Sequence, residues 1–252
     1  MDLGLSGKRV LVTGGTRGIG AAIVDCFLAE GAKVAFCARD AAQVKARVLE
    51  LQAQGHEVAA TAVDVSDAEA YASWLSGSVE ALGGADIFVP NVSGGAQAGE
   101  EGWKSAFDVD LMATVRGCEA MLPHLAASGA GAIVVIASIA GLEDFGAPSA
   151  YNTVKAGLVA YASQLGAVAA PHGIRVNTVS PGPIHVDDGF WGSVKRAQPE
   201  TYQATEARHP QGRLGTVREV ANCVAFLASP AASWVTRTNM IVDGGFTKRV
   251  QF

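Results

Sequence analysis

The sequence predicts an α/β fold: a single doubly wound domain over residues 1–252, built on a mostly parallel sheet. Short apolar runs alternate with helix-like segments along the whole chain, and regular strand–helix alternation builds a parallel sheet with right-handed crossovers. The apolar runs are continuous rather than interleaved with polar residues, as expected for strands that are covered on both faces. No linker or break in composition divides the chain into two domains.

The expected elements follow one another in a regular order. Strands are expected at residues 9–13, 33–38, 57–63, 85–89, 132–137, 174–180 and 239–242. Helices are expected at residues 19–30, 41–54, 68–82, 103–125, 147–170 and 217–228. Residues 181–215 combine glycines, prolines and aromatic residues and are expected to be irregular. Because such folds bind ligands beyond the carboxyl ends of the strands, we expect about residues 183–215 to form a substrate lid.

Composition excludes several classes of protein. Hydrophobic residues make up 49% of the chain and charged residues 17%, which excludes an intrinsically disordered chain. The formal net charge of −5 argues against a nucleic-acid partner, since phosphates are neutralised by a basic face. The four cysteines are widely spaced, which predicts reduced thiols and no metal site. Neither a signal peptide nor a bilayer-spanning apolar stretch is recognised, so we expect a cytoplasmic protein without a membrane partner.

A glycine-rich loop follows the first expected strand and precedes the first expected helix. It reads Thr13-Gly14-Gly15-Thr16-Arg17-Gly18-Ile19-Gly20. Glycines allow a tight turn and let backbone N–H groups approach a pyrophosphate, and the positive end of the helix dipole favours the anion. Such turns also occur for packing reasons alone. The position between a strand and a helix nevertheless favours dinucleotide binding by a Rossmann domain.

The charge at the end of the second expected strand bears on the choice of dinucleotide. A carboxylate there would bind the ribose hydroxyls of NAD, but the chain has Ala38-Arg39. Arg17 of the glycine loop could meet Arg39 over the adenosine ribose, and two guanidinium groups suit a 2′-phosphate. We therefore expect NADP(H) to be preferred, with NAD(H) as the alternative cofactor. In the competing interpretation both arginines are solvated and Arg39 pairs with Asp40.

Three side chains suggest acid–base chemistry. Tyr151 and Lys155 are four residues apart in an expected helix, which places them on one helix face. A neighbouring ammonium lowers the pKa of a tyrosine, whose ordinary value is about 10, so the phenol can exchange a proton with a carbonyl or alcohol oxygen. Ser138 follows the preceding strand, where its hydroxyl can hydrogen-bond the same oxygen. Each residue alone has an ordinary structural role as its alternative; their order after a phosphate loop favours catalysis.

The combination of motifs resembles the short-chain dehydrogenase/reductase family over essentially the whole chain. The nearest resemblance is to bacterial 3-oxoacyl-carrier-protein reductases and their carbonyl-reductase relatives. The motifs that carry it are Thr13-Gly14-x-x-x-Gly18-x-Gly20, Asp64-Val65, Asn91, Ser138, Tyr151-x-x-x-Lys155, Asn177, Pro181-Gly182 and Val242-Asp243-Gly244-Gly245.

The resemblance implies a role for each matching residue. Tyr151 would be the acid/base, Lys155 would hold the nicotinamide ribose and lower the tyrosine pKa, and Ser138 would polarise the carbonyl. The hydride passes between cofactor and substrate carbon, so the protein supplies positioning and proton transfer. The expected cofactor-binding residues are Gly14, Thr16, Arg17, Gly18, Ile19, Gly20, Arg39, Asp64, Val65, Asn91, Ser93, Tyr151, Lys155, Pro181, Gly182 and Ile184.

Several positions depart from the family pattern. The asparagine that usually completes the catalytic set, seven residues after a tryptophan, is Asp110 here. We expect Asp110 to act in catalysis by holding a water at the end of the lysine relay. A threonine near the nicotinamide amide is replaced by Val186, and a glycine before the last strand by Arg237. The usual Asn-Asn-Ala-Gly after the fourth strand reads Pro90-Asn91-Val92-Ser93.

Three functions remain open at the level of sequence. The first is an oxidoreductase of free, small-to-medium ketones or secondary alcohols, and the second is a 3-oxoacyl-carrier-protein reductase. Docking an acidic carrier needs cations beside the active-site mouth, but the positions that carry arginines in such reductases are Gly129 and His172. The third is a non-catalytic dinucleotide-binding regulator, which an intact Ser138, Tyr151 and Lys155 disfavour.

Two expectations concern surfaces rather than chemistry. Residues 151–170 are rich in alanine, glycine and serine, which lets helices of two subunits approach closely, and the resemblance implies a homotetramer built in this way. In the expected lid, His185, Phe190 and Trp191 could shape a small or aromatic pocket.

Overall fold

The computed structural model, which describes residues 2–248 and 250, has a seven-stranded parallel sheet in the order β3-β2-β1-β4-β5-β6-β7. The strand order reverses between β1 and β4, so the fold is doubly wound, as the sequence predicted. The strands are β1 (Arg9–Thr13), β2 (Lys33–Ala38), β3 (Val58–Ala62), β4 (Ile87–Val89), β5 (Ala132–Ile136), β6 (Arg175–Pro181) and β7 (Asn239–Val242).

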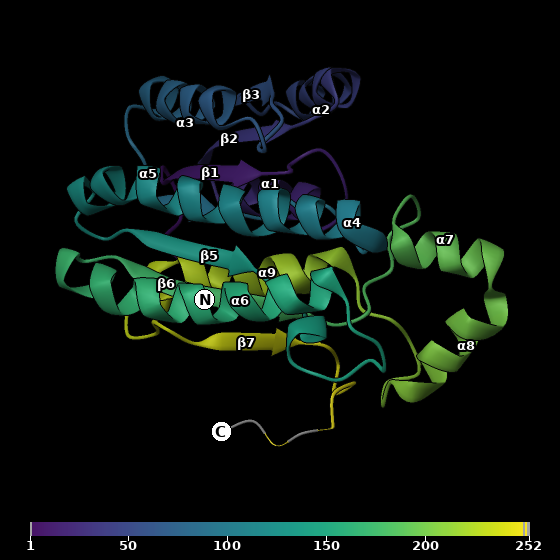
Figure 1. The fold of residues 1–252 in the computed structure, drawn as a ribbon. Helices are drawn as coiled ribbons and strands as arrows, with labels where there is room; N and C mark the ends of the chain where they lie inside the picture. The colour runs from purple at the N-terminus through teal and green to yellow at the C-terminus, as the bar shows by residue number, and fades with distance from the viewer. Residues whose placement is uncertain (1, 249, 251–252) are drawn as a thin grey trace.

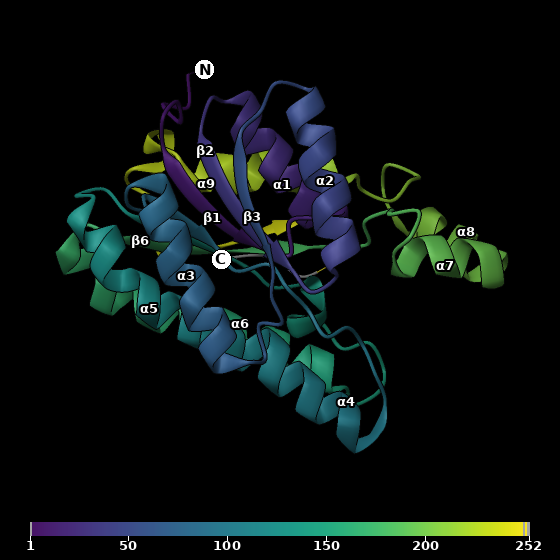
Figure 2. The ribbon, with the colours of Figure 1, turned by 90° about the horizontal axis from the view of Figure 1, so that it is seen from above.

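Helices cover both faces of the sheet (Figure 2). One face carries α1 (Gly18–Ala29), α2 (Ala41–Ala53) and α9 (Val217–Ala228). The other carries α3 (Ala68–Leu82), α5 (Ala113–Ala127) and α6 (Ala150–Ala169). Further segments are α4 (Gly99–Ser105), the π-helix η1 (Ala106–Met112), the 3₁₀ helices η2 (Ile139–Gly141), η3 (Ala170–His172) and η4 (Pro230–Ala232), and the helices α7 (Phe190–Ala197) and α8 (Pro199–Arg208).

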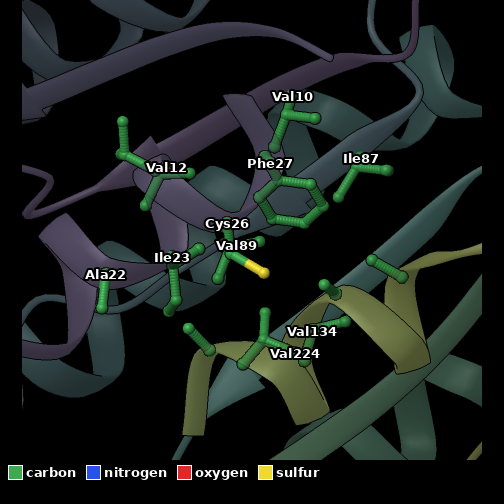
Figure 3. Packing of buried hydrophobic residues seen from close by; sticks show 14 of the residues in the cluster. Val10, Val12, Ala22, Ile23, Cys26, Phe27, Ile87, Val89, Val134 and Val224 are labelled. Atoms are coloured by element: carbon green, nitrogen blue, oxygen red, sulfur yellow. The ribbon is translucent and has the colours of Figure 1, made fainter. Parts of the chain in front are cut away.

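Alternate residues of β1 contribute to two separate cores. Val10 and Val12 of β1 pack with Phe27 of α1 in one core, shown in Figure 3. Leu11, which lies between them, packs with Phe88 in the core on the other face. Successive side chains of a strand point to opposite faces, so a strand with two apolar faces must be continuously apolar. The unbroken apolar runs of the sequence have this cause.

Most element bounds agree with the prediction. The observed bounds of β1, β2, β7, α3 and α9 are those expected, and the remaining strands differ by one or two residues. The helix expected at 103–125 is in fact α4, η1 and α5 in unbroken succession, with a π-helical segment in the middle. Intrinsic helix propensity does not distinguish an i→i+5 from an i→i+4 ladder, so the π segment had no sequence signal.

The expectation of an irregular stretch over 181–215 is wrong, because this segment contains α7 and α8. Gly189 is the N-cap of α7 and Pro199 is the first residue of α8. Glycine and proline are compatible with helix starts, so here they separate two helices. Both helices lie beyond the carboxyl ends of the strands (Figure 1).

The segment that carries α7 and α8 leaves and rejoins the domain at one point. Ile184 and Gly215 form a parallel bridge. The N–H of His185 donates to the Gly215 carbonyl at 2.9 Å, and the N–H of Gly215 donates to the Pro183 carbonyl at 3.0 Å. The two ends of the segment are therefore clamped together at the edge of the sheet where ligands bind in this fold. Among the described residues, no helix is long and apolar enough to span a membrane.

Candidate active site

A cleft of about 1040 Å³ lies at the carboxyl ends of the strands, bounded on one side by the glycine loop and on the other by residues of α7 and α8. All but one of the site residues predicted from the sequence line it: Gly14, Thr16, Arg17, Gly18, Ile19, Gly20, Arg39, Asp64, Val65, Asn91, Ser93, Ser138, Tyr151, Lys155, Pro181, Gly182 and Ile184. The exception is Asp110, which is buried behind the lining.

The glycine loop makes two approaches that a side chain would prevent. A Cβ on Gly15 would meet the ring of Phe36 at 2.7 Å, and one on Gly20 would overlap the Gly14 carbonyl. Gly14 itself has φ +74°, in the left-handed region that favours glycine. The N–H groups of Gly14 and Gly15 both donate to the Cys37 carbonyl of β2, at 2.8 and 3.1 Å. The loop is thus held tightly across the end of the sheet.

The helix that follows the loop begins differently from its neighbours. Asp40 caps α2 and Asp67 caps α3, each through its carboxylate. Arg17, the N-cap of α1, makes no side-chain capping bond within the described part of the chain. The first N–H groups of α1 are therefore left for an external acceptor, and an anion such as a pyrophosphate suits a helix start of this kind.

Asn91 secures the loop from the neighbouring strand. Its backbone N–H donates to Thr13 Oγ1 at 2.9 Å, and its side-chain Nδ2 donates to the Thr13 carbonyl at 3.0 Å. Asn91 also lines the cleft. The side-chain amide thus joins β4 to the end of β1 at the point where the strand order reverses.

The two arginines expected near the adenosine ribose both line the cleft, but they have different surroundings. Asp40 accepts from the N–H groups of Ala42 and Gln43, and no ion pair joins it to Arg39 among the described residues. Arg17 Nη1 lies 3.2 Å from the Asp188 carbonyl oxygen and 3.7 Å from its carboxylate. Arg17 therefore reaches from the glycine loop to the segment that carries α7.

Asp64 lies at the same end of the cleft. Its carboxylate accepts hydrogen bonds from the hydroxyl and the N–H of Ser66, at 2.7 and 3.0 Å. These bonds, with the charge of Arg39 as a smaller contribution, lower the pKa of Asp64 below its usual range. The carboxylate is an ionised acceptor at neutral pH.

Ser138, Tyr151 and Lys155 are brought together at the middle of the cleft. Ser138 lies just beyond β5, and its Oγ accepts from the Ala140 N–H at 3.1 Å. Tyr151 and Lys155 lie one turn apart in α6. Lys155 Nζ lies 5.5 Å from the centroid of the Tyr151 ring. It also donates to the Ile136 carbonyl of β5 at 3.1 Å, which ties the helix to the strand that carries Ser138.

Asp110, which the sequence predicted to hold a water at the end of the lysine relay, lies in direct contact with Lys155. Its Oδ1 is 3.1 Å from Lys155 Nζ, and both side chains are buried. Its Oδ2 accepts from the Gly94 N–H at 2.7 Å, and its carbonyl accepts from Thr114 Oγ1. Asp110 comes from η1, the π-helical segment. Wide turns of this kind occur often at functional sites.

The segment with α7 and α8 contributes residues that the sequence did not single out. Phe190 and Trp191 line the cleft, as expected, but His185 instead bonds to Tyr202 and Asp187 within the segment. The lining residues missed from the sequence include Gln97, Phe145, Thr205, Arg208 and Phe246. They come from separate parts of the chain and form no motif, so only the tertiary fold could reveal them.

Two positions that depart from the family pattern, Val186 and Arg237, make local contacts. Val186 lies against the glycine loop, where a Cβ on Gly18 would meet its side chain at 3.7 Å. Arg237 has φ +63°, a conformation that costs a non-glycine residue about 1–2 kcal/mol. Its Nε donates to the Ser163 carbonyl at 3.0 Å, which offsets part of this cost.

Gly129 and His172 do not lie beside the cleft. Gly129 follows α5 and precedes β5, and His172 ends η3 just before β6. Both therefore lie at the amino ends of the strands, opposite the cleft. The expectation that they flank the active-site mouth is wrong for a single chain, because a loop that enters a strand is at its amino end.

The comparison with known families accords with this geometry. A family model described as enoyl-(acyl carrier protein) reductase matches residues 14–247, which include the glycine loop and the Ser138, Tyr151 and Lys155 cluster. The chain belongs to the short-chain dehydrogenase/reductase family. Relatives of this chain are named as dehydrogenases and reductases, and the protein is an oxidoreductase that acts on a CH–OH group or the corresponding carbonyl.

Similar proteins span the whole chain. Isoepoxydon dehydrogenase from Penicillium expansum is 39% identical over 100% of this chain and 99% of its own length. A 3-oxoacyl-[acyl-carrier-protein] reductase from Chlamydia pneumoniae is 31% identical over 98% of this chain and 100% of its own. The crystal structure of L-sorbose reductase from Gluconobacter frateurii, complexed with NADPH and L-sorbose, superposes with a TM-score of 0.91 at 31% identity, over 99% of this chain and 100% of that one.

Proposed function

We propose that the protein is an NADP(H)-dependent oxidoreductase that interconverts free, small-to-medium ketones and secondary alcohols. The observation that carries the proposal is the meeting of Ser138, Tyr151 and Lys155 in a cleft that begins at an anion-binding glycine loop. Similar proteins support it by name: they include isoepoxydon dehydrogenase and L-sorbose reductase.

The cleft fits a nicotinamide dinucleotide. The start of α1 has no side-chain cap, so its first N–H groups are left for a pyrophosphate. The close approaches of Gly15 to Phe36 and of Gly20 to the Gly14 carbonyl hold the loop in the shape that presents these groups. Asp64 and Val65 would hold the adenine, while Pro181, Gly182 and Ile184 would hold the nicotinamide. When bound, the dinucleotide supplies the hydride that reduces the carbonyl carbon, or accepts it in the reverse direction.

The protein's own part in the reaction is proton transfer and charge stabilisation. In the direction of reduction, Tyr151 donates its phenolic proton to the carbonyl oxygen as negative charge develops there. The Ser138 hydroxyl donates a hydrogen bond to the same oxygen. In oxidation Tyr151 takes the proton from the alcohol.

Lys155, which lines the cleft, and the buried Asp110 support this proton transfer. The Lys155 ammonium beside the Tyr151 ring stabilises the phenolate left after proton donation. The ion pair with Asp110 and the bond to the Ile136 carbonyl hold that ammonium in place. Asp110 therefore acts as a positioning residue, through Lys155.

The preference for NADP(H) over NAD(H) rests on charge. Arg39 follows β2 at the position where a carboxylate would bind the ribose hydroxyls of NAD, and Arg17 lies in the glycine loop. The neighbouring carboxylate, Asp40, is engaged in capping α2. Arg39 has no ion pair among the described residues, and Arg17 contacts Asp188. Two guanidinium groups at this end of the cleft favour a cofactor that carries a 2′-phosphate.

We also propose that the protein is a homotetramer with close contacts between α6 helices. A Cβ on Gly157, in the middle of α6, would have no neighbour within 4 Å. Val168 is 67% exposed on the same helix. A helix surface with small and exposed apolar residues is suited to pairing with a second copy.

The test is a panel of ketones, diketones and alcohols, with turnover measured by the absorbance of NADPH or NADH. We expect reduction of several free ketones, and a larger kcat/KM for them than for a 3-oxoacyl group linked to a carrier protein. A large advantage for the carrier-linked substrate, lost at high salt, would favour the carrier-protein reductase instead. Tight dinucleotide binding without turnover of any compound would indicate a non-catalytic regulator.

A further inference from the structure

An arginine of α8 lies at the end of the cleft farthest from the adenosine site. Thr205 and Arg208 are three residues apart in α8, on one helix face, and both line the cleft. The Arg208 guanidinium lies over the ring of Phe246, 4.4 Å from its centroid. Phe246 follows β7, is buried and also lines the cleft. Two segments far apart in sequence thus fix the position of this cation.

Arg208 differs in its partners from Lys155 and Arg17, and shares with Arg39 the lack of an ion pair among the described residues. Lys155 is paired with Asp110, and Arg17 with Asp188. Arg208 has neither an ion pair nor a hydrogen bond among the described residues. Packing against an aromatic face holds a guanidinium without neutralising it, and its N–H groups stay available for a bidentate acceptor. The cleft therefore contains a positioned and uncompensated positive charge.

The Arg208 guanidinium lies far from the end of the cleft where the cofactor phosphates would bind. Arg39 follows β2, whereas Phe246 follows β7, five strands away in the sheet. With adjacent strands about 4.8 Å apart, this corresponds to about 24 Å. Figure 1 shows α8 on the side of the sheet toward which β7 points. Arg208 is thus too far away to hold a 2′-phosphate beside Arg39.

Part of the cleft lining is aromatic. Phe145, Phe190 and Trp191 line the cleft together with Phe246, and the rings of Phe190 and Trp191 pack edge to face, 5.2 Å apart. Such a lining suits an apolar body, since a few polar groups in an otherwise apolar pocket determine the orientation of a ligand. Beside Phe246, Arg208 adds a positive charge to this lining.

We propose that Arg208 binds a carboxylate of the substrate, so that the enzyme prefers oxo acids and hydroxy acids whose acid group is separated from the reacting carbon by an apolar body. This inference rests on the proposed function, because it concerns a second group of the same substrate, remote from the carbonyl that is reduced. Arg208 then selects substrates by charge: the carboxylate pairs with the guanidinium while the carbonyl oxygen faces Ser138 and Tyr151. A neutral ketone of the same shape leaves the guanidinium unpaired.

The test compares acids with their methyl esters. Levulinate, 4-oxocyclohexanecarboxylate and 4-acetylbenzoate place the two groups at different separations, and each ester keeps the shape but lacks the charge. We expect at least one acid to exceed its ester in kcat/KM by about tenfold or more, as one charge-assisted hydrogen bond can provide. Arg208→Gln should abolish this preference mainly through KM, and Arg208→Lys should keep part of it.

Arg218→Gln is the matched control, because it removes the same charge from an exposed position of α9 that does not line the cleft. It should leave the acid preference unchanged. Calorimetric binding of cyclohexanecarboxylate and of the neutral cyclohexanecarboxamide to the enzyme loaded with oxidised cofactor gives a readout independent of turnover. The acid should bind more tightly in wild type and not in Arg208→Gln.

Two outcomes would overturn the inference. Equal use of acids and esters across the panel is one, and an acid preference that survives Arg208→Gln is the other. In either case the reduction of the esters would leave the proposed ketone reductase function intact. Failure to reduce any ketone, acid or ester would instead reject the proposed function, even if cyclohexanecarboxylate still required Arg208 to bind.

Discussion

Lys155 Nζ lies 3.1 Å from Asp110 Oδ1, and the two side chains are 2% and 0% exposed. In this buried ion pair, Asp110 occupies the position where the family usually has an asparagine. A carboxylate accepts hydrogen bonds as an amide oxygen does, and it also compensates the lysine charge. The pair therefore links the π-helical segment η1 to the helix that carries Tyr151.

Substitutions of Asp110 should show whether Lys155 needs its hydrogen-bond acceptor or its negative charge. Asp110→Asn keeps an oxygen for Lys155, and we expect kcat within about tenfold of wild type. Asp110→Leu leaves a buried, uncompensated ammonium and should cost about 3–5 kcal/mol in unfolding free energy, with kcat reduced at least a hundredfold. Chemical denaturation and steady-state kinetics measure both effects. Asp108→Asn, an exposed neighbour in η1, is the control, and full activity in the leucine variant would show that Asp110 has no part in turnover.

Cofactor preference should depend on the arginine after β2. Arg39→Asp removes a guanidinium that suits the 2′-phosphate and introduces a carboxylate that suits the ribose hydroxyls. We expect kcat/KM with NADPH to fall at least tenfold and the value with NADH to rise. Lys45→Asp, the same change of charge at an exposed position of α2 that does not line the cleft, should leave the ratio unchanged. Equal efficiency of the wild type with both cofactors would refute the charge assignment.

The fold could be predicted in detail because its signals are local. Continuous apolar runs such as β1 mark strands that are buried on both faces. The glycine loop and the Tyr151–Lys155 spacing are equally local. Each of these features lies within a few neighbouring residues, so a single sequence contains it completely.

The rest of the site depends on contacts between distant segments. Arg208 and Phe246 meet only because β7 and α8 end at the same edge of the sheet. The direct contact of Asp110 with Lys155 depends on a π-helical turn that no residue type signals. Even a familiar motif position misleads when its place in the fold is unknown: Gly129 lies at the opposite end of the sheet from the cleft.

Assembly should depend on the small residues of α6. Gly157→Leu adds a side chain at a position with open space around it in one chain, so the monomer should fold as before. The same side chain should prevent close packing of two α6 helices, and light scattering should show dimers or monomers in place of tetramers. Gly77→Leu in α3, a helical glycine with similar open space, is the control. A wild type that is a stable monomer would contradict the proposal at once.

The start of α9 should contribute stability that acid removes. Hydrogen bonds from Arg213 and from the Thr216 N–H lower the pKa of Glu219 from 4.5 to about 2. A lowered pKa stabilises the fold above the unfolded value of 4.5, and this contribution disappears as the pH falls through about 2. Glu219→Gln should therefore unfold more easily by about 1 kcal/mol near neutral pH, as expected for a half-exposed pair.

Thermal unfolding of this variant between pH 7 and pH 2 provides the check. The difference from wild type should shrink steadily below pH 4.5. Glu80→Gln, which alters an exposed carboxylate of α3, should show no such trend. A gap between Glu219→Gln and wild type that stays constant down to pH 2 would mean that the carboxylate charge is not what stabilises this helix start.

Tyr151 transfers the proton in the proposed nicotinamide-dependent ketone reduction. Tyr151→Phe removes only the phenolic hydroxyl, so cofactor binding should persist while proton donation is lost. The decisive measurement is turnover of the best ketone by Tyr151→Phe, beside NADPH affinity from fluorescence titration of the same sample. We expect kcat to fall by at least a thousandfold with the NADPH dissociation constant within a few-fold of wild type. Near-wild-type turnover by a correctly folded Tyr151→Phe protein would contradict the account.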